Sequence, residues 1–467
     1  MTRSSPIPRD RAFDSTLSLL SEGYEFIPSR ARRLGSDIFE TRLMLRPAVC
    51  ITGEEAVRVF YEPDRFTRRG AIPVTALKLL QDRGSVQTLD GEAHRRRKAM
   101  FMSLMSPEAV GRLMRLVETD WRNQIPRWQG MEAIVLGAEV QAILCRAVCR
   151  WAGLDLSPSD EAARTRELAA MVEGAGSVGP RNWKGMLLRT RTERWARGIV
   201  DAVRARDLVV PEGSATHLIA WYRDQNGRPL DTDAAAVELL NVLRPTVAVA
   251  RYVTFAALAL HEHPEDRRAL EGAPDRVDDE ALEAFVQEVR RFYPFFPLVG
   301  GRVLTPFEWR GHRFERDAWV LLDLYGTLHD ERLWRDAGSF RPERFRGRKP
   351  TAFDLVPQGA GEHHAGHRCA GEWITIAVMK TALRLLTGAM RYTVPEQDLR
   401  IDLSRMPAAP ASGFIIRDVA PSAGADREDR SAGGAPPRFP PTDAGTAAAV
   451  GGDGIDAPRD ARKGGQS

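Results

Sequence analysis

The sequence has few cysteines, little net charge and no long apolar run. Only four Cys occur in 467 residues, too few and too scattered for a disulfide framework. The 67 Lys and Arg against 63 Asp and Glu leave a formal net charge of +4, which gives little attraction for a nucleic-acid backbone. The longest apolar run starts at Val247 and is broken at Arg251, and the polar N-terminus lacks the apolar stretch of a signal peptide. We therefore expect a cytoplasmic protein with no membrane span and no nucleic-acid partner.

The composition is that of a folded protein with a different C-terminal end. With 43% hydrophobic and 28% charged residues, the chain can bury a large core. Residues 1–420 show helical periodicity without repeats or linker composition, which predicts a single domain. Residues 421–467 are dominated by Gly, Ala, Pro and charged residues, and they cannot bury enough apolar area to offset their ordering entropy. This segment is predicted to be a disordered tail.

Helical patterns dominate the predicted domain, and only short β-prone segments lie between them. Apolar residues at three-to-four spacing predict helices at 53–61, 91–103, 107–125, 132–152, 159–174, 183–207, 232–263, 277–293 and 371–389. Strands are predicted at 38–51, 299–304, 307–310, 316–323, 391–394 and 412–417. The long helix at 232–263 would span about 48 Å and is expected to cross the middle of the domain.

An Arg-Pro dipeptide interrupts the most apolar part of this long helix. Arg244 and Pro245 lie in LLNVLRPTVAVARYVTFAALAL, where proline removes a backbone donor and clashes with the preceding turn, at a cost of about 3 kcal/mol. One interpretation is a kink with Arg244 ion-paired or reaching towards solvent. The other is a guanidinium directed into a cavity to bind an anion, since arginine binds carboxylates through two parallel hydrogen bonds.

Cys369 lies in a glycine-rich loop that leads into an apolar helix, FDLVPQGAGEHHAGHRCAGEWITIAVMK. The helix N-terminus is expected to lower the pKa of the thiol, and Gly371 would let the backbone approach a flat ligand. A single cysteine is also commonly a small buried apolar residue. Cys145 and Cys149 are four residues apart in QAILCRAVCRWAG and are predicted to pack in the core rather than to bind a metal.

Two further motifs precede this cysteine loop. EVRR at 288–291 places Glu288 and Arg291 three residues apart on one helix, where they can pair. FRPERF at 340–345 supplies Arg344 in a proline-containing, non-helical segment. Taken alone, each motif would be read as a surface ion pair or a loop charge. Their order and spacing relative to the cysteine loop make the combination unusual.

A Glu-x-x-Arg helix, a Pro-Glu-Arg-Phe segment and a glycine-rich Cys loop in this order resemble the cytochrome P-450 superfamily across residues 10–420. The resemblance implies a mainly α fold with a small β portion, a long central distal helix and a haem b cofactor. It makes Cys369 the axial thiolate ligand of the haem iron. Glu288, Arg291 and Arg344 would form the triad that locks the structure behind the haem.

The sequence also departs from the common pattern of the superfamily. The cysteine loop usually carries Phe and Gly where this sequence has Glu362 and Ala365. A typical monooxygenase has an acidic residue followed by Thr in the distal helix, whereas this chain has Arg244 and Pro245. Arg-Pro at this place resembles the fatty-acid peroxygenase branch, as do the stretches LDGEAHRRRK, VGPRNWKG, FVQEVRRFYP, LLDLYGT and MPAAPASGF.

The branch implies hydrogen-peroxide-dependent hydroxylation of long-chain fatty acids at the α and/or β carbon, without a redox partner protein. Arg244 would bind the substrate carboxylate, which would act as the general acid–base that moves a proton between the two peroxide oxygens. Pro245 would belong to the same distorted turn. A carboxylate fixed in this way presents Cα and Cβ for reaction. Gln87, in SVQTLDG, matches the Gln of the hydroxylases, whereas members that make terminal alkenes carry His.

Basic residues are expected to hold the haem propionates. His94 and Lys98 are four residues apart on one face of the 91–103 helix and match the propionate-binding positions of the branch. His367 is a common propionate donor in the superfamily, and Arg68 is a further candidate. From the residues alone, RRRK would be a solvated basic face.

Three other functions stay open at this point. A fatty-acid decarboxylase that gives terminal alkenes would keep the peroxide chemistry. A conventional monooxygenase dependent on O₂ and NAD(P)H would need separate redox partners, and Arg244 and Pro245 argue against it. A haem-binding sensor or a carboxylate carrier would bind its ligand without turnover.

Overall fold

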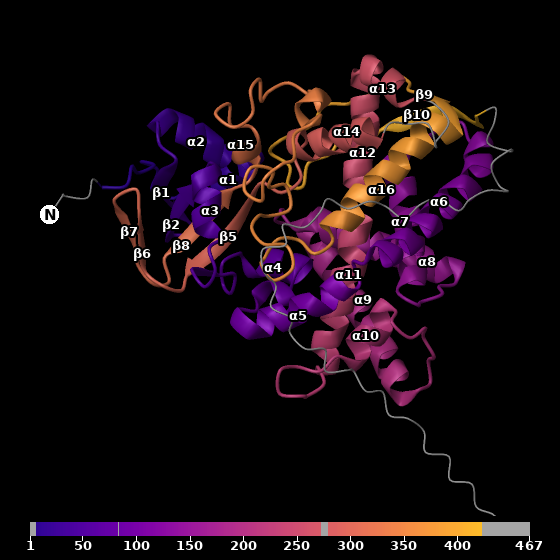
Figure 1. The fold of residues 1–467 in the computed structure, drawn as a ribbon, viewed down its shortest axis with the longest axis horizontal. Coiled ribbons are helices and arrows are strands. Elements are labelled where there is room, and N and C mark those ends of the chain that lie inside the picture. Colours follow the sequence, from indigo (N-terminus) through magenta and orange to yellow (C-terminus); the bar gives the residue numbers. More distant parts are fainter. Residues whose placement is uncertain (1–5, 83, 272–278, 423–467) are drawn as a thin grey trace, which may run out of the picture.

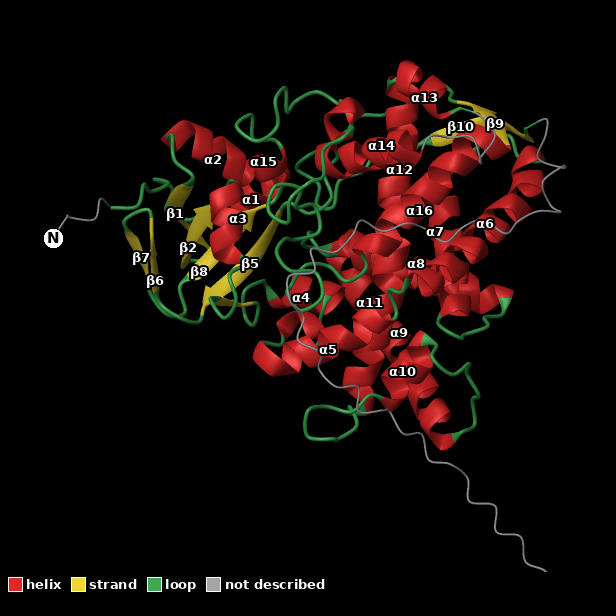
Figure 2. Cartoon of the chain, in the orientation of Figure 1, coloured by secondary structure: helices red, strands yellow, loops and turns green. Residues whose placement is uncertain are grey.

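The computed structural model describes residues 6–82, 84–271 and 279–422. A large helical part lies beside a smaller part that holds most of the strands (Figures 1 and 2). The predicted fold class, mainly α with a small β portion, is confirmed. Of the predicted tail, residues 423–467 lie outside the described residues, and Pro421 is the last residue of the final strand.

The helices of the larger part pack around a central pair, α11 and α12, and further helices lie beside the large sheet. They span α1 (Thr16–Glu22), α2 (Phe26–Leu34), α3 (Glu54–Phe60), α4 (Val74–Leu80), α5 (Gly91–Ser103), α6 (Pro107–Gln129), α7 (Leu136–Trp151), α8 (Pro158–Gly174), α9 (Pro180–Ala205), α10 (Ala215–Trp221), α11 (Thr232–Ala248), α12 (Ala250–Glu262), α13 (Pro264–Leu270), α14 (Asp279–Phe292), α15 (Tyr325–Leu328) and α16 (Glu372–Arg384). Helices α6, α8, α10 and α11 each begin after a Ser or Asp whose side-chain oxygen accepts a backbone N–H of the first turn.

The strands form one five-stranded sheet and two smaller ones. They span β1 (Ile38–Leu43), β2 (Arg46–Ile51), β3 (Phe66–Thr67), β4 (Ile134–Val135), β5 (Leu298–Val303), β6 (Phe307–Trp309), β7 (His312–Phe314), β8 (Trp319–Asp323), β9 (Met390–Thr393) and β10 (Ile415–Pro421). The large sheet has the order β1-β2-β8-β5-β3, in which only β2 and β8 run parallel. Its register places Cys50 opposite Leu321, so residues far apart in the sequence meet in this sheet.

The central apolar segment is one helix in the prediction and two in the structure. Helix α11 ends at Ala248 and α12 begins at Ala250, so the segment is interrupted at Val249, one turn after Pro245. Pro245 leaves the carbonyl of Asn241 without its usual donor, but it lies inside α11, four residues before the interruption at Val249. Thr232–Glu262 is apolar and long enough to cross a membrane, but 89% of its most apolar stretch is buried inside the protein. The segment is therefore the core of the helical part, packed against α7, α8 and α9.

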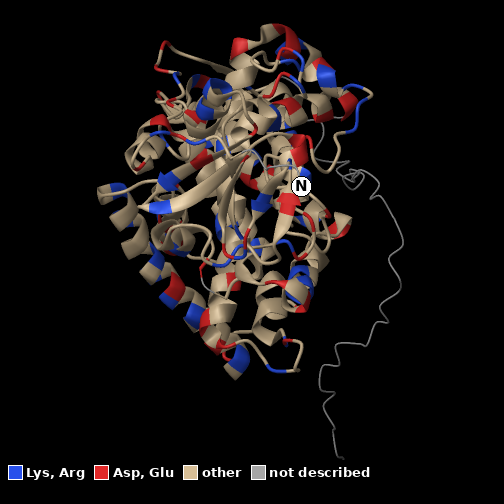
Figure 3. Cartoon of the chain, turned by 90° about the vertical axis from the view of Figure 1, so that its left-hand side faces the viewer, with Lys and Arg blue, Asp and Glu red and all other residues tan. Residues whose placement is uncertain are grey.

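The sequence analysis was least accurate for short helices and strands. The predicted strand at 38–51 is a hairpin whose turn residues Met44 and Leu45 have φ values of 51° and 60°. Helices α4 and α10 have seven residues each and were not predicted, because two turns are too short to establish periodicity. Figure 3 shows Lys and Arg interspersed with Asp and Glu along the chain, in line with the small net charge of the sequence.

Candidate active site

Cys369 lies three residues before α16, at the end of the glycine-rich loop. Its backbone N–H donates to the carbonyl of Gln358 at 3.1 Å, and Gln358 Nε2 lies 3.9 Å from the Cys369 Sγ. Gly371 caps α16, and a Cβ added there would lie 4.0 Å from the Sγ. The sequence predicted a lowered thiol pKa, but burial raises the pKa of Cys369, and Lys98 opposes this only in part. The prediction was wrong because desolvation of the thiolate outweighs the helix N-terminus.

The unusual Glu362 of this loop has a structural role. Its carboxylate accepts backbone N–H groups from His364 at 2.8 Å, from Ala365, and from Gly366 at 3.2 Å. Burial alone would raise the pKa of Glu362, but these hydrogen bonds bring it below its usual value. The carboxylate thus closes the turn at residues 362–366.

Sequence reasoning missed a second ion-paired carboxylate beside the cysteine. Glu372, in the first turn of α16, pairs with the fully buried Arg290 and with Arg368 Nε at 2.6 Å. Burial alone would raise the pKa of Glu372, but the two guanidinium groups lower it to about 2. Arg290 lies in the same EVRR motif as Arg291, so the motif itself was the available signal. Arg290 pairs with Glu372 and Arg291 with Glu288, because adjacent residues point to different sides of a helix.

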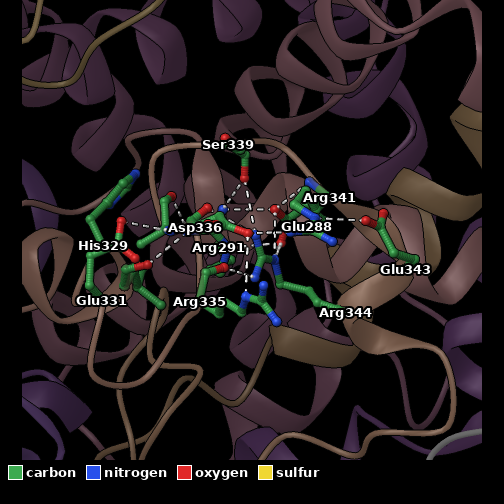
Figure 4. Close-up of polar contacts among 12 residues, drawn as sticks. Glu288, Arg291, His329, Glu331, Arg335, Asp336, Ser339, Arg341, Glu343 and Arg344 are labelled. Carbon is green, nitrogen blue, oxygen red and sulfur yellow. Dashed lines mark hydrogen bonds and ion pairs between the residues drawn. The ribbon is translucent and has the colours of Figure 1, made fainter.

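The predicted triad of Glu288, Arg291 and Arg344 is brought together (Figure 4). Glu288 pairs with Arg291 through two hydrogen bonds of 2.7 and 2.8 Å, and Arg344 Nε donates to the same carboxylate at 3.1 Å. Arg291 also donates to the carbonyls of Leu328 and Ala337, each at 2.9 Å. Glu288 and Arg291 are fully buried. The triad ties α14 to the segment before the cysteine loop.

The four predicted propionate ligands form one cluster of basic side chains, in which His94 and Lys98 are buried and His367 and Arg68 are half-buried. The rings of His94 and His367 stack with centroids 4.0 Å apart, and Lys98 Nζ donates to the carbonyl of Arg368. Burial, with Lys98 as the next cause, lowers the pKa of His94 to about 4. Burial, with Arg68 as the next cause, lowers the pKa of His367 to about 2.

This cluster has the chemistry that the carboxylates of a haem require. Burial lowers the pKa of Lys98 to about 8 and also lowers that of Arg68. Arg68 lies over the ring of Phe60 at 4.1 Å, and its Nη1 is buried without a hydrogen-bond partner among the described residues. Lys98 and Arg68 are desolvated cations, and Arg68 has an unused donor, so an anionic group would stabilise both. The residues present therefore fit haem b, with Cys369 as the thiolate and this cluster as the partner of the propionates.

Arg244 is another buried guanidinium that is incompletely paired. Only 3% of the residue is exposed, and Nη2 donates to the carbonyl of Leu80 and to Asn241 Oδ1 at 2.9 Å. Nη1 is buried and has no hydrogen-bond partner within the described ranges. Burial lowers the pKa of Arg244 to about 9, and Arg189 on α9 adds to this shift. The interpretation in which Arg244 is ion-paired or reaches solvent is wrong, because the side chain does neither.

The predicted Gln87 lies on the other side of Asn241. Asn241 Nδ2 donates to Gln87 Oε1 at 3.4 Å and to Glu238 Oε2 at 2.9 Å. Pro245 follows Arg244 within α11, one turn before its end. Asn241 and Glu238 were missed, although Asn241 precedes Arg244 by three residues on the helix and could have been found by that spacing.

Comparisons with known proteins agree with this geometry. The family described as Cytochrome P450 matches residues 273–408. The structure of cytochrome P450EX alpha (CYP152N1) with myristic acid has a TM-score of 0.86 and 42% identity, and covers 90% of this chain and 100% of that one. Cytochrome P450SP alpha (CYP152B1) in complex with (R)-ibuprofen has a TM-score of 0.84 and 48% identity, and covers 87% and 99%.

Two further relatives are more distant in sequence. A variant of cytochrome P450 OleT in complex with arachidonic acid has a TM-score of 0.85 and 33% identity, covering 90% of this chain and 99% of that one. Cytochrome P450 26C1 of Homo sapiens is 26% identical over 425 residues, 79% of each protein. Because relatives well above 30% identity cover most of the chain in sequence and in fold, the protein belongs to the cytochrome P450 family, in its CYP152 branch.

Proposed function

We propose that this protein is a fatty-acid peroxygenase that uses hydrogen peroxide to hydroxylate long-chain fatty acids at the α and/or β carbon. The observation that carries this proposal is Arg244, a buried guanidinium whose Nη1 has no partner within the described part of the chain. Such a desolvated donor is suited to a carboxylate, which compensates its charge and accepts its free N–H. The relatives support this substrate class, since myristic acid, (R)-ibuprofen and arachidonic acid are all carboxylic acids.

The residues around Arg244 fix how the carboxylate would be held. Arg244 Nη2 donates to the Leu80 carbonyl and to Asn241 Oδ1, and these two hydrogen bonds orient the guanidinium. Nη1 stays available for a carboxylate. A fatty acid bound by its carboxyl end at a fixed guanidinium presents Cα and Cβ at a constant position. The bound carboxylate would take a proton from one oxygen of hydrogen peroxide and return it to the other.

Haem b, when bound through Cys369, supplies the iron centre at which hydrogen peroxide is used. The side chains that would hold it are the cluster of Arg68, His94, Lys98 and His367. A conventional monooxygenase has an acidic residue and Thr at the positions of Arg244 and Pro245. They are not required for proton transfer here, because the carboxylate of the substrate transfers the proton. A separate redox partner is not required either.

Two alternatives are separated by particular residues. Decarboxylation to a terminal alkene would use the same Arg244 contact, and Gln87 in place of His favours hydroxylation. A monooxygenase served by redox partners would need its own proton donors in α11, where the buried polar side chains next to Arg244 are Asn241 and Thr246. Thr246 donates to the Val242 carbonyl at 2.9 Å, within its own helix.

Product analysis tests the proposal directly. Purified ferric protein is mixed with tetradecanoic acid and hydrogen peroxide, with no reductase and no pyridine nucleotide. We expect 2- and 3-hydroxytetradecanoic acid. Terminal alkene as the main product would contradict the role of Gln87, and turnover only with NADPH and redox proteins would overturn the peroxygenase function. Spectral binding of the acid without turnover in either mixture would indicate a sensor or carrier.

The Arg244→Ala variant tests the carboxylate contact itself. We expect turnover to fall by about a hundredfold or more, because a charge-assisted contact to the substrate is lost while haem binding elsewhere is retained. Arg244→Lys keeps the positive charge but lacks the two parallel N–H donors of a guanidinium, so we expect it to recover only part of the lost turnover. Arg194→Ala, an exposed arginine on α9, is the matched control. Parent-like turnover of Arg244→Ala would contradict the anchoring role.

The catalytic unit is proposed to comprise residues 1–420 and to act in the cytoplasm. The apolar segment Thr232–Glu262 supports this location, because it is buried in the helical core. Recovery of the full-length protein in the membrane pellet of fractionated cells would contradict it.

A further inference from the structure

One buried carboxylate, Glu238, connects α11 with α5 and with the turn that carries Gln87. Its side chain is fully buried in α11, and Oε1 accepts from Arg97 Nη1 at 2.6 Å and from the backbone N–H of Val86 at 2.8 Å. Oε2 accepts from Asn241 Nδ2 at 2.9 Å. Arg97 lies on α5, the helix of the propionate cluster, and Val86 precedes Gln87. Glu238 thus holds α5, the Gln87 turn and the Arg244 helix together.

Glu238 also decides which way the Asn241 amide faces. Burial raises the pKa of Glu238, and the charge of Arg97 and the hydrogen bonds from Asn241 and the Val86 N–H favour its ionised form. Both oxygens of Glu238 accept hydrogen bonds, so Asn241 turns its NH₂ group towards the carboxylate. Asn241 Oδ1 then faces the other way, where it accepts from Arg244 Nη2 at 2.9 Å. The same NH₂ group reaches Gln87 Oε1 at 3.4 Å. One ionised carboxylate therefore orients both the guanidinium and the glutamine.

The neutral amide between the two charges keeps them from pairing directly. Arg97 compensates Glu238 at 2.6 Å and lies over the ring of Tyr222 at 5.1 Å. Arg244 makes no ion pair within the described residues, and its Nη1 stays without a partner. A carboxylate placed directly on Arg244 would compete with that of a substrate.

We propose that Glu238 is a positioning residue for the carboxylate site: it fixes the Asn241 amide so that a neutral oxygen, not a charge, holds Arg244. The inference rests on the proposed function, because it assigns Arg244 to substrate binding. It concerns Glu238 and its partner Arg97, which act through Asn241 and touch no substrate.

Glu238→Gln in the holoenzyme is the first test. A glutamine offers a donor as well as an acceptor, so the Asn241 amide can rotate and turn its NH₂ group towards Arg244. We expect the dissociation constant of tetradecanoic acid, measured from the spin-state change of the ferric haem, to rise about tenfold. KM should rise with it, while kcat at saturation changes little. Binding within about twofold of the parent, with haem retained, would overturn the proposal.

Two further variants separate positioning from stability. Glu238→Gln combined with Asn241→Asp keeps the hydrogen-bond pattern but moves the negative charge next to Arg244. We expect this double variant to retain haem and to bind the fatty acid no better than Glu238→Gln, because the new carboxylate competes for the guanidinium. Recovery of parent affinity would overturn the proposal. If Glu238→Gln does not fold, the double variant Arg97→Met, Glu238→Gln removes both buried charges. We expect the same rise in the dissociation constant of tetradecanoic acid for this double variant.

The matched control is Asp120→Asn. Asp120 is also a buried carboxylate paired with an arginine, Arg150, at 2.6 Å, but it lies on α6. We expect it to lower thermal stability without changing fatty-acid affinity. An equal loss of affinity in this control would show a general effect of destabilisation and would overturn the proposal.

The positioning role can be separated from the proposed function. If the parent holoenzyme gives no spectral response to tetradecanoic acid, the fatty-acid function fails. Crystal structures of the parent and of Glu238→Gln then test the positioning alone. We expect Arg244 Nη2 to leave Asn241 in the variant, and an unchanged contact would overturn the proposal.

Discussion

Two pairs of arginines differ in how completely their guanidinium groups are hydrogen-bonded. In Arg291 and Arg344, each guanidinium nitrogen donates to Glu288 or to a backbone carbonyl (Figure 4). In Arg68 and Arg244, Nη1 is buried without a partner among the described residues. A buried donor without an acceptor costs about 1–3 kcal/mol. The complete pairing of Arg291 and Arg344 fits a role in holding the fold, whereas the unused Nη1 of Arg68 and of Arg244 is available to an anion from outside the chain.

Removing Glu288, the carboxylate that pairs with Arg291 and Arg344, has the largest expected effect on stability. Glu288→Ala leaves two buried guanidinium groups without their carboxylate and should lower the free energy of unfolding by about 3–5 kcal/mol. Denaturant unfolding and the haem-to-protein ratio measure this loss. Arg341→Ala removes an arginine whose side chain is 41% exposed and should cost less than about 1 kcal/mol. Equal stabilities of the two variants would contradict the comparison.

Asp323 sharpens the comparison because it is a buried carboxyl that pairs with no arginine in the described part of the chain. It accepts from Thr52 Oγ1 at 3.1 Å and from the Gly326 N–H at 2.8 Å, and burial raises its pKa from 3.8 to about 7. The folded state therefore keeps a proton that the unfolded chain releases, so stability falls as the pH rises from about 4 to about 7. The full difference corresponds to about 4 kcal/mol.

Asp323→Asn should remove this part of the pH dependence. Denaturant unfolding of parent and variant at several pH values between about 4 and about 7 measures it. Parallel pH profiles for the two proteins would show that Asp323 titrates normally. Asp10 is the matched comparison, since it is buried but paired with Arg30 at 2.7 Å, and its pKa is lowered rather than raised.

Arg68→Met tests the incompletely paired set at the propionate cluster. Removing a desolvated guanidinium with an unused donor should leave the stability of the apoprotein unchanged or higher, in contrast to Glu288→Ala. Haem affinity should fall about tenfold, because a charged donor for a propionate is lost. Haem transfer to apomyoglobin measures this affinity. Arg191→Met, at an exposed position on α9, should change neither property.

Gln87→His has the smallest expected effect. The Gln87 contact with Asn241 is long, 3.4 Å, and the side chain is only partly buried. We expect total turnover to change less than about threefold while the fraction of terminal alkene rises. Gas chromatography of the products measures both quantities. An unchanged alkene fraction would show that Gln87 does not direct the outcome.

Sequence reasoning succeeded where the signal was long or held in a motif. The periodic helices were found, and Glu288, Arg291 and Arg344 were chosen from a motif whose members meet in space. The helix-start argument failed for Cys369, because burial of its thiol cannot be read from neighbouring letters. Asn241 and Glu238 were not predicted for a related reason, because the sequence of a helix does not show which residues surround its polar side chains in the fold.

The sequence by itself determined the mainly α architecture, the cysteine loop and the Arg-Pro interruption in the central helix. These depend on periodicity and short motifs, which act over a few residues. The tertiary structure decided that Arg244 is buried with a free Nη1, and that Glu238 joins Arg97, Val86 and Asn241. Burial and pairing arise only when elements distant in the chain pack together, so the energy of a charge is set by the fold and not by its neighbours in the sequence.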